Sequence, residues 1–202
     1  TKRHNYLENH EIKHSTYDWL VFKKIRAKFG GKIRALVSGS APVPKDISMD
    51  IKLMLSVPLV EGYGMTELSG GSNGTSIYDC SNSNVGAPLR TLYLKLVDKK
   101  ELNYHSGTEL DGKPAPTGEI CYKGPSVFAG YFRDPENTKQ TIDSDGWLHT
   151  GDVGMIDPIN KGLKIVDRVK EIFKLSQGEY IAPAKLEGAY NKSPFVAQIC
   201  IY

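Results

Sequence analysis

The hydrophobic pattern of the chain changes from a helical period near its start to a strand period later on. Five apolar residues at helical spacing predict an amphipathic helix: Tyr17, Leu20, Val21, Ile25 and Phe29. Gly30 and Gly31 end this helix. A second helix begins at Pro44, between short apolar strands at 32–38 and 58–60. The apolar positions of this second helix are Ile47, Ile51, Met54 and Leu55.

A strand, a helix and a second strand in this order form a βαβ unit, which predicts two parallel strands joined by a right-handed crossover. Ligands of open parallel sheets bind beyond the carboxyl ends of the strands. The loop at 39–42 and the segment at 63–67 each follow one of the two predicted strands. We therefore expect the loop and the segment to lie side by side at that edge of the sheet.

From about Val85 onward, short apolar stretches alternate with turn signals. Leu92, Leu94 and Leu96 alternate with other side chains, as in a strand with two different faces. Further strands are predicted at 119–123, 147–149, 153–157 and 163–167. The turn signals between them are Asp111-Gly112, Asp134-Pro135, Asp145-Gly146 and Asn160-Lys161-Gly162. The fold class is therefore α/β plus an antiparallel β subdomain.

Three other stretches complete the predicted elements. Residues 69–76 are rich in Gly, Ser and Thr but hold no lysine, and no helical pattern follows them, so we expect a mobile connection there. Pro183 opens a short helix that runs to about Tyr190. A last strand is expected at 195–202.

The composition narrows the class of protein without naming an activity. The 202 residues are 40% hydrophobic and 24% charged, which is typical of a soluble globular protein. The formal charge of +3 and the lack of a basic run with aromatic residues argue against a nucleic-acid partner. No apolar stretch is long enough to cross a bilayer. Cys80, Cys121 and Cys200 are odd in number and far apart, which favours reduced thiols inside a cell.

The candidate chemistry begins at residues 58–67, which read PLVEGYGMTE. Gly62 and Gly64 flank Tyr63, so the backbone is expected to turn sharply there and to let a ligand approach. An aromatic ring suits a base, the hydroxyl of Thr66 suits a phosphate oxygen, and the carboxylate of Glu67 suits Mg²⁺. A strand that runs into a Gly-rich turn, with no ligand at all, explains the same residues equally well.

Three motifs together resemble the signatures of adenylate-forming enzymes. They are GYGMTE at 62–67, GWLHTGD at 146–152 and DRVKE at 167–171. Three more stretches are similar to long-chain acyl-CoA synthetases of the eukaryotic type, namely GKIRALVSGSAP at 31–42, GYFRDP at 130–135 and FKLSQGEYIAP at 173–183. The resemblance covers nearly the whole chain from about Asp18 onward.

This resemblance implies long-chain fatty acid activation. Such enzymes join a fatty acid to ATP, which gives an acyl-adenylate and pyrophosphate, and the thiol of CoA then attacks the acyl carbon. The implied substrates are the fatty acid, ATP and CoA, and the implied metal is Mg²⁺. The implied location is intracellular, in the cytoplasm or at the cytoplasmic face of the endoplasmic reticulum. Acyl chain length, membrane association of the full-length protein and oligomeric state stay open.

The resemblance also implies roles for single residues. The positions around the adenine would be Gly39, Ser40, Ala41, Pro42, Glu61, Gly62, Tyr63, Gly64 and Met65. Tyr63 would stack on the base, Thr66 would hydrogen-bond the α-phosphate and Glu67 would hold Mg²⁺. Asp152 would accept hydrogen bonds from both ribose hydroxyls, because its carboxylate has paired oxygens. Arg168 would add a cationic contact to the ribose.

Two further positions follow the same motifs. Lys170 would be the hinge about which a C-terminal domain turns between the two half-reactions, and it is grouped with Thr66 and Glu67 as catalytic. Gly178 would line the path of the pantetheine arm. Plainer explanations stay open for four of these positions. They are Tyr63 as a core residue, Asp152 as a turn residue, Arg168 as the partner of Asp167 in a surface ion pair, and Lys170 as a solvated charge beside Glu171. His149 is expected to be structural.

The resemblance divides the chain into four parts. Residues 1–84 would be the C-terminal part of the α/β sheet subdomain of an AMP-binding domain, and 85–166 the antiparallel β subdomain. Residues 167–172 would form the hinge, and 173–202 the start of a small C-terminal domain. The loop for the β- and γ-phosphates would lie upstream of Thr1, and the lysine for the acyl carboxylate downstream of Tyr202. The sequence therefore predicts an internal fragment that is inactive alone and self-associates through open sheet edges.

Three rival hypotheses remain at this stage. The chain could belong to an adenylate-forming enzyme that activates an aryl or amino acid, although the stretch at 173–183 argues against it. It could be a noncatalytic nucleotide-binding or interaction module. It could also be a phosphate-binding protein built on the loop at 69–76.

Overall fold

A computed structural model describes residues 2–41, 43–79, 81, 84–169, 172–174, 180–181, 183–191 and 193–201. The chain forms two units, Thr1–Arg90 with Asn160–Leu163, and Thr91–Ile159 with Lys164–Tyr202. Each unit has its own sheet.

The first unit begins with helices. They are α1 (Lys2–Asn9), α2 (Ser15–Tyr17), the π-helix η1 (Asp18–Phe22), α3 (Lys23–Lys28) and, after the first strand, α4 (Lys45–Leu55). The helix predicted from the apolar residues at 17–29 is present, and Gly30 and Gly31 end it with positive φ angles. Its apolar stripe is nevertheless exposed at Leu20, Val21 and Phe29. Periodicity therefore located this helix but did not identify a buried face.

A buried lysine ties the helices of the first unit together. Lys2 of α1 is almost fully buried and pairs with Asp18 of η1. Its ammonium also donates to the Leu53 carbonyl oxygen at 2.6 Å and to the Ser56 hydroxyl at 2.8 Å, at the C-terminal end of α4. Arg26 of α3 donates to the same Ser56 hydroxyl at 2.7 Å. Four helical elements, α1, η1, α3 and α4, thus share one charged cluster, in which hydrogen bonds compensate for the burial of the charges.

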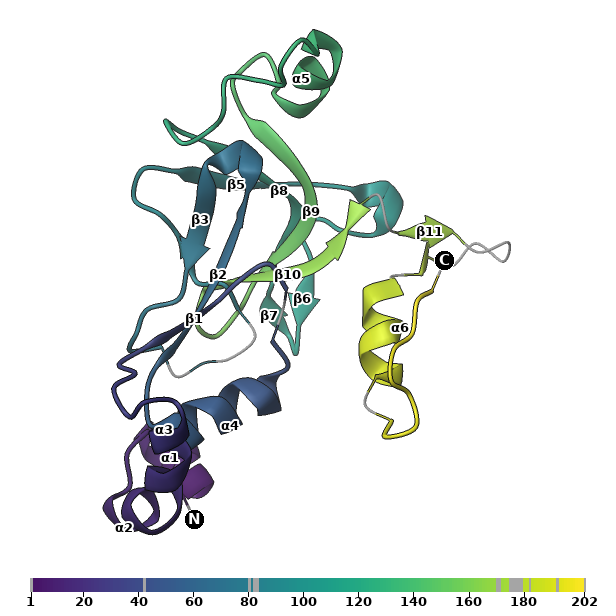
Figure 1. Ribbon diagram of the computed structural model, residues 1–202. Helices are drawn as coiled ribbons and strands as arrows, with labels where there is room; N and C mark the ends of the chain where they lie inside the picture. The colour runs from purple at the N-terminus through teal and green to yellow at the C-terminus, as the bar shows by residue number, and fades with distance from the viewer. Residues whose placement is uncertain are drawn as a thin grey trace. The chain divides into compact units, whose positions relative to one another are not determined.

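The sheet of the first unit is mixed. Its order is β1 (Leu36–Ser38), β2 (Leu59–Met65), β3 (Gly70–Gly74) and β4 (Ala87–Pro88) (Figure 1). The predicted parallel pairing of the first two strands is confirmed, with Leu36 opposite Leu59. β2 and β3 pair antiparallel, as do β3 and β4. Residues 69–76 were predicted to be a mobile connection, which is wrong, because β3 lies inside that stretch.

The sheet of the second unit is four-stranded, in the order β10 (Leu163–Arg168), β9 (Leu148–Ile156), β8 (Thr117–Lys123) and β5 (Tyr93–Val97) (Figure 1). β5 and β9 both pair antiparallel with β8, as the alternating pattern predicted. The strands predicted at 147–149 and 153–157 are one strand, β9. Ile120, Tyr122 and Leu148 are fully buried in this sheet and form part of its core.

Smaller elements surround this sheet. They are η3 (Lys100–Leu102), the hairpin of β6 (Glu109–Leu110) and β7 (Lys113–Pro114), and α5 (Pro135–Thr141). Asp134 caps α5, because its carboxylate accepts the backbone N–H of Asn137 at 3.0 Å. The Asp-Pro pair at 134–135 therefore starts a helix instead of a plain turn.

The last elements are short. β11 (Phe173–Lys174) pairs antiparallel with β12 (Tyr180–Ile181), and α6 (Pro183–Tyr190) confirms the helix predicted after Pro183. The strand predicted at 195–202 is wrong for its described residues, 195–201, which lie outside any strand. Within the described part of the chain, no helix is both long enough and apolar enough to span a lipid bilayer.

Acid should destabilise the first unit through Asp18. Burial alone would raise the pKa of this carboxyl, but hydrogen bonds from Lys2, the His14 backbone and Ser56 outweigh burial and lower the pKa to about 2. Because this pKa lies below the unfolded value, the stabilisation is present above about pH 4 and disappears as the pH falls towards about 2. The free energy of unfolding should therefore lose about 2 kcal/mol over this range through Asp18 alone.

Urea unfolding of this chain and of Asp18→Asn at several pH values measures the effect. The variant should lack this part of the acid dependence, whereas Asp46→Asn, which alters an exposed pair with Arg3, should keep it. If Asp18→Asn does not fold, the double variant with Lys2→Met removes both buried charges. Equal pH dependence in wild type and the Asp18 variants would contradict the prediction.

Candidate functional site

The loop after β1 lies beside β2 in the first unit. Ser38 at the end of β1 is opposite Glu61 in the parallel register. A Cβ atom on Gly39 would lie 3.6 Å from the carbonyl oxygen of Gly62, so the start of the loop runs alongside the glycine that precedes Tyr63. Ser40 has a φ of +69°, a conformation that costs energy in a residue other than glycine. Ala41 is exposed, and Pro42 lies outside the described residues.

The glycines of the GYGMTE motif serve strand packing. Gly62 and Gly64 lie inside β2, so the sharp turn expected there does not occur. A Cβ atom on Gly64 would lie 1.8 Å from the carbonyl oxygen of Gly70 in β3. A Cβ atom on Gly62 would lie 3.3 Å from the carbonyl oxygen of Asn73. The backbone of β3 therefore occupies the space of a side chain at Gly64, whereas at Gly62 it leaves only a tight fit.

A register break lies next to Tyr63. Tyr63 is opposite Asn73, but Gly64 is opposite Gly71, so Ser72 is an extra residue in β3. Ser72 is fully buried, and its hydroxyl donates to the Tyr63 carbonyl oxygen at 3.1 Å. This bond fixes the backbone of Tyr63, whose side chain is half-buried.

The acidic residues at the two ends of the motif differ in their surroundings. Glu61 is buried and accepts the Ser48 hydroxyl of α4 at 3.2 Å, while its backbone N–H donates to the Thr75 hydroxyl at 2.9 Å. Met65 ends β2, and the exposed Thr66 and half-buried Glu67 begin the short 3-10 helix η2 (Thr66–Leu68). Mg²⁺ prefers oxygen ligands and keeps several of its waters, so the more accessible carboxylate of Glu67 fits the predicted metal better than the buried one of Glu61.

In the second unit, Asp152 and Arg168 form an ion pair between neighbouring strands. Nε of Arg168 in β10 lies 3.1 Å from Oδ1 of Asp152 in β9. The carboxylate is largely buried, whereas the arginine side chain is 65% exposed. Asp152 is therefore a strand residue and not a plain turn residue. Arg168 pairs with Asp152, whereas the plainer alternative had paired it with Asp167.

Asp167 instead binds Tyr104 and the backbone of Arg168. The phenol of Tyr104 donates to Oδ2 at 3.2 Å, and the Arg168 N–H donates to Oδ1 at 3.0 Å. Burial, together with the charge and hydrogen bond of Asp167, raises the pKa of Tyr104 to about 12, so the phenol stays a donor at neutral pH. This contact fixes the backbone from which the Arg168 side chain extends.

Asp152 lies in a bulge of β9. Glu119 is opposite Val153 and Cys121 is opposite His149, so the residues from Thr150 to Asp152 share a single opposite residue of β8, Ile120. The motif GWLHTGD therefore carries its aspartate at an irregular point of the sheet. Bulges of this kind change the direction of a side chain.

Side chains of both strands satisfy the backbone of the bulge. The Thr150 hydroxyl donates to the Ile120 carbonyl oxygen at 2.8 Å and accepts the Asp152 N–H at 3.1 Å. Oε1 of Glu119 accepts the N–H of Gly151 at 3.2 Å. Gly151 has a φ of +73°, which only glycine adopts readily.

Glu119 belongs to a buried charged network. Its Oε2 lies 3.0 Å from Nδ1 of His149 and 3.0 Å from Nζ of Lys99. The other ring nitrogen of His149 lies 3.3 Å from Oδ2 of Asp143. Burial would raise the pKa of Glu119, but the hydrogen bonds from His149 and Lys99 lower it, so the carboxylate stays charged. His149 thus links two carboxylates, a role that its place on a short strand did not reveal.

Among the described residues, one group has the spacing of a metal site. Ligand atoms of Glu119, Cys121 and His149 lie within 4.8 Å of one another. Burial, with the nearby charge of Glu119, raises the pKa of the Cys121 thiol to about 12. Lys99 already supplies a positive charge to Glu119, and both ring nitrogens of His149 already lie within hydrogen-bond distance of carboxylates. The group therefore fits a hydrogen-bond network better than a metal site. Cys200 is a free, exposed thiol.

Two further predicted site residues belong to the hinge and to the pantetheine path. Lys170 and Gly178 lie outside the described residues.

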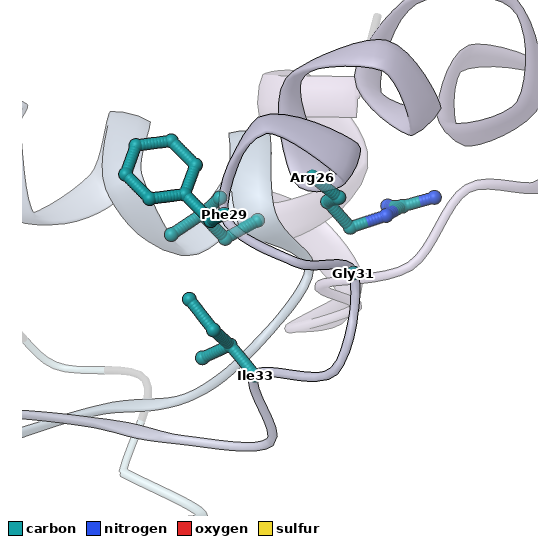
Figure 2. Close-up of a pocket in the computed structure, with 5 residues that line it drawn as sticks. Arg26, Phe29, Gly31 and Ile33 are labelled. Atoms are coloured by element: carbon teal, nitrogen blue, oxygen red, sulfur yellow. The ribbon is translucent and has the colours of Figure 1, made fainter.

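Figure 2 shows Arg26, Phe29, Gly31 and Ile33 around a cavity of about 10 Å³, too small for a nucleotide. These residues are separate from every predicted site position.

Comparison with known proteins gives one family match. Residues 5–132 match a family model described as AMP-binding enzyme. The chain is 46% identical over 92% of its length to a peroxisomal long chain acyl-CoA synthetase 7 of Arabidopsis thaliana. It is 47% identical over 93% of its length to a human long-chain-fatty-acid–CoA ligase 6. The chain spans about a quarter, 26%, of the length of each of these relatives.

Solved structures show the same fold. The A domain of a carboxylic acid reductase from Segniliparus rugosus, in complex with AMP and a co-purified carboxylic acid, matches 99% of this chain with a TM-score of 0.74 and 34% identity. This chain covers 30% of that protein. O-succinylbenzoate coenzyme A synthetase from Bacillus subtilis, in complex with AMP, matches 88% of this chain with a TM-score of 0.67 and 27% identity, and the chain covers 35% of it.

A methyl group at Gly64 should separate β2 from β3. In Gly64→Ala the new atom would also lie 2.7 Å from the carbonyl carbon of Gly70, so the strands must move apart. We expect the free energy of unfolding to fall by about 3 kcal/mol, as for a severe overpacking substitution. Urea unfolding of this chain measures the change.

Gly71→Ala is the matched control. Gly71 lies in the same hairpin with a φ that any residue can adopt, and its Cβ would meet nothing within 4 Å. The control should change stability by less than about 1 kcal/mol. Equal losses in the two variants would show that the close approach at Gly64 does not constrain the hairpin.

Proposed function

This chain belongs to the AMP-binding enzyme family, and on that premise we propose that it forms part of a long-chain fatty acid–CoA ligase. The reaction joins a fatty acid to ATP, which gives an acyl-adenylate and pyrophosphate. The acyl group then passes to the thiol of CoA, and AMP leaves. The names of the two curated relatives support the fatty acid and CoA as substrates, and the AMP-bound structural relatives support the adenylate. The predicted fold class, α/β with an antiparallel β subdomain of the adenylate-forming fold, is confirmed.

The observation that carries the proposal is the ion pair of Asp152 and Arg168 at the bulge of β9. Arg168 Nε holds one carboxylate oxygen at 3.1 Å and so fixes the plane of the carboxylate. A fixed carboxylate suits two neighbouring hydroxyls, which is the arrangement that a ribose offers. The long, exposed side chain of Arg168 can contact the ribose from the solvent side. We therefore assign ribose binding to this pair.

The first unit supplies the groups for the base and the phosphate. Tyr63 stacks on the adenine, and the loop from Gly39 to Pro42 closes the other side, which the position of Gly39 next to Gly62 supports. The hydroxyl of Thr66 is exposed and donates to the α-phosphate. Glu67 would hold Mg²⁺, which when bound neutralises charge on the phosphates. These groups position the nucleotide for in-line attack by the carboxylate of the acid.

The remaining assignments follow the family motifs. Lys170 acts as the hinge between the half-reactions, and Gly178 lines the pantetheine path of CoA. The domain boundaries proposed from the sequence are 1–84, 85–166, 167–172 and 173–202. We also propose an intracellular location, supported by the free thiols of Cys121 and Cys200, and self-association of this chain through open sheet edges.

A second candidate differs only in the acid. The likeness to a carboxylic acid reductase domain bound to a co-purified carboxylic acid favours adenylation of some other carboxylic acid. Both candidates use the same nucleotide site. The acid dependence of pyrophosphate exchange therefore separates them.

Pyrophosphate exchange by the full-length native protein that contains this sequence tests the proposal. With ATP and Mg²⁺, a fatty acid of about 16 carbons should support exchange at least roughly 10-fold better than benzoate or an amino acid. Exchange with benzoate alone would favour the second candidate. Exchange with none of the acids would overturn adenylate formation altogether.

Asp152→Asn should lower kcat/KM for ATP by roughly 10- to 100-fold, because a charge-assisted hydrogen bond to the ribose is lost. Asp111→Asn is the control, since Asp111 lies in the turn between β6 and β7 with a φ of +51° that asparagine also adopts. This control should keep the wild-type value. An unchanged kcat/KM in Asp152→Asn would remove the ribose assignment.

A further inference from the structure

We infer that Thr150 and Glu119 are positioning residues, which hold the β9 bulge so that Asp152 faces the ribose. The inference rests on the proposed function, because it concerns the same nucleotide. Neither residue contacts the ligand in this assignment. Each acts on Asp152 through the backbone.

The bulge is the reason why Asp152 needs positioning residues. A bulge bends the strand that carries it and changes the direction of the side chains within it. Here the residues from Thr150 to Asp152 are opposite Ile120 alone. A return to regular pairing would therefore redirect the carboxylate of Asp152.

Thr150 replaces the ladder bonds that the bulge removes. Its hydroxyl donates to the Ile120 carbonyl oxygen at 2.8 Å, across the strand pair. The same oxygen accepts the N–H of Asp152 at 3.1 Å. One hydroxyl thus connects the opposite strand to the backbone of the residue that carries the carboxylate. Without it, two backbone groups in the sheet lose their partners, which costs free energy.

Glu119 fixes Gly151, which lies between Thr150 and Asp152 in the chain. Its buried carboxylate accepts the N–H of Gly151. This hydrogen bond holds the glycine in its left-handed conformation. Lys99 and His149 bind the other oxygen at 3.0 Å each, so the carboxylate itself has little freedom to rotate. A hydrogen bond to a charged acceptor is stronger than one to a neutral acceptor, and it fixes a direction, which burial alone does not.

A loosened bulge should affect only the contact of Asp152 with the ribose hydroxyls. Loosening the bulge should move the carboxylate of Asp152 and leave the surfaces for the base unchanged. The clearest readout is therefore the ratio of affinities for AMP and 2′-deoxy-AMP, since only AMP offers both hydroxyls. A purely structural residue would lower stability without changing this ratio.

The experiment uses the full-length native protein with Thr150→Val, Thr150→Ser and Thr117→Val. Valine removes the hydroxyl at nearly constant shape, and serine keeps it. Thr117 is the matched control, because it is a buried threonine of β8 whose hydroxyl also bonds to backbone, accepting His105 N–H at 3.0 Å. Calorimetry gives the two affinities, and hydrogen exchange of the peptide that contains Gly151 reports the bulge directly.

In Thr150→Val we expect AMP to bind roughly 10-fold more weakly, with 2′-deoxy-AMP nearly unchanged and exchange at Gly151 faster. KM for ATP should rise, whereas KM for CoA stays constant. Thr150→Ser should restore the wild-type values, and Thr117→Val should lower the melting temperature alone. Glu119→Gln should weaken the binding of AMP but not that of 2′-deoxy-AMP, since it removes the charge that binds Lys99 and His149.

Three results would overturn the inference. They are an unchanged AMP to 2′-deoxy-AMP ratio in both Thr150→Val and Glu119→Gln, an equal change in Thr117→Val, or no AMP binding by the wild-type protein. AMP binding with no activation of a fatty acid would instead overturn the proposed function. In that case the variants still decide the positioning role, because their readouts need no acid.

Discussion

A register break in an antiparallel strand pair is the constraint on which both candidate segments depend. Such a break leaves backbone groups without ladder partners, and buried groups of this kind need substitutes. In the first unit the buried hydroxyl of Ser72 bonds to the carbonyl oxygen of Tyr63. In the second unit the hydroxyl of Thr150 bonds to the carbonyl oxygen of Ile120. Each unit therefore presents its candidate side chain, Tyr63 or Asp152, next to an irregularity that a side-chain hydroxyl helps to stabilise.

The two bulges use glycine for different physical reasons. Gly64 is required because the backbone of β3 lies where its side chain would be. Gly151 would meet nothing within 4 Å, and it is required because its φ is +73°. A substitution at Gly64 thus acts through steric overlap, whereas one at Gly151 acts through backbone strain. The motif letters alone do not distinguish these two cases.

Much of the fold could be predicted because its signals are local. Gly30, Gly31 and Pro44 mark helix ends, and alternating apolar residues mark β5, so the parallel pair, the antiparallel sheet and the fold class followed from the sequence. The part of β2 that follows Val60 and the whole of β3 did not, because their glycines have low strand propensity and only pairing with each other makes them strands. The contact of Glu119 with Gly151 joins residues 32 positions apart, and no local pattern signals it. The family motifs indicated Asp152 and Arg168 but gave no sign of the residues that hold them.

The charges around Glu119 explain why a buried network can hold the bulge at an acceptable cost. Burying a lone carboxylate is unfavourable, but Lys99 pairs with Glu119, and His149 lies between Glu119 and Asp143. The Cys121 thiol stays neutral beside them because burial raises its pKa. Since these contacts are internal to the second unit, the backbone of Asp152 is ordered before a nucleotide binds, and that ordering does not reduce the binding free energy.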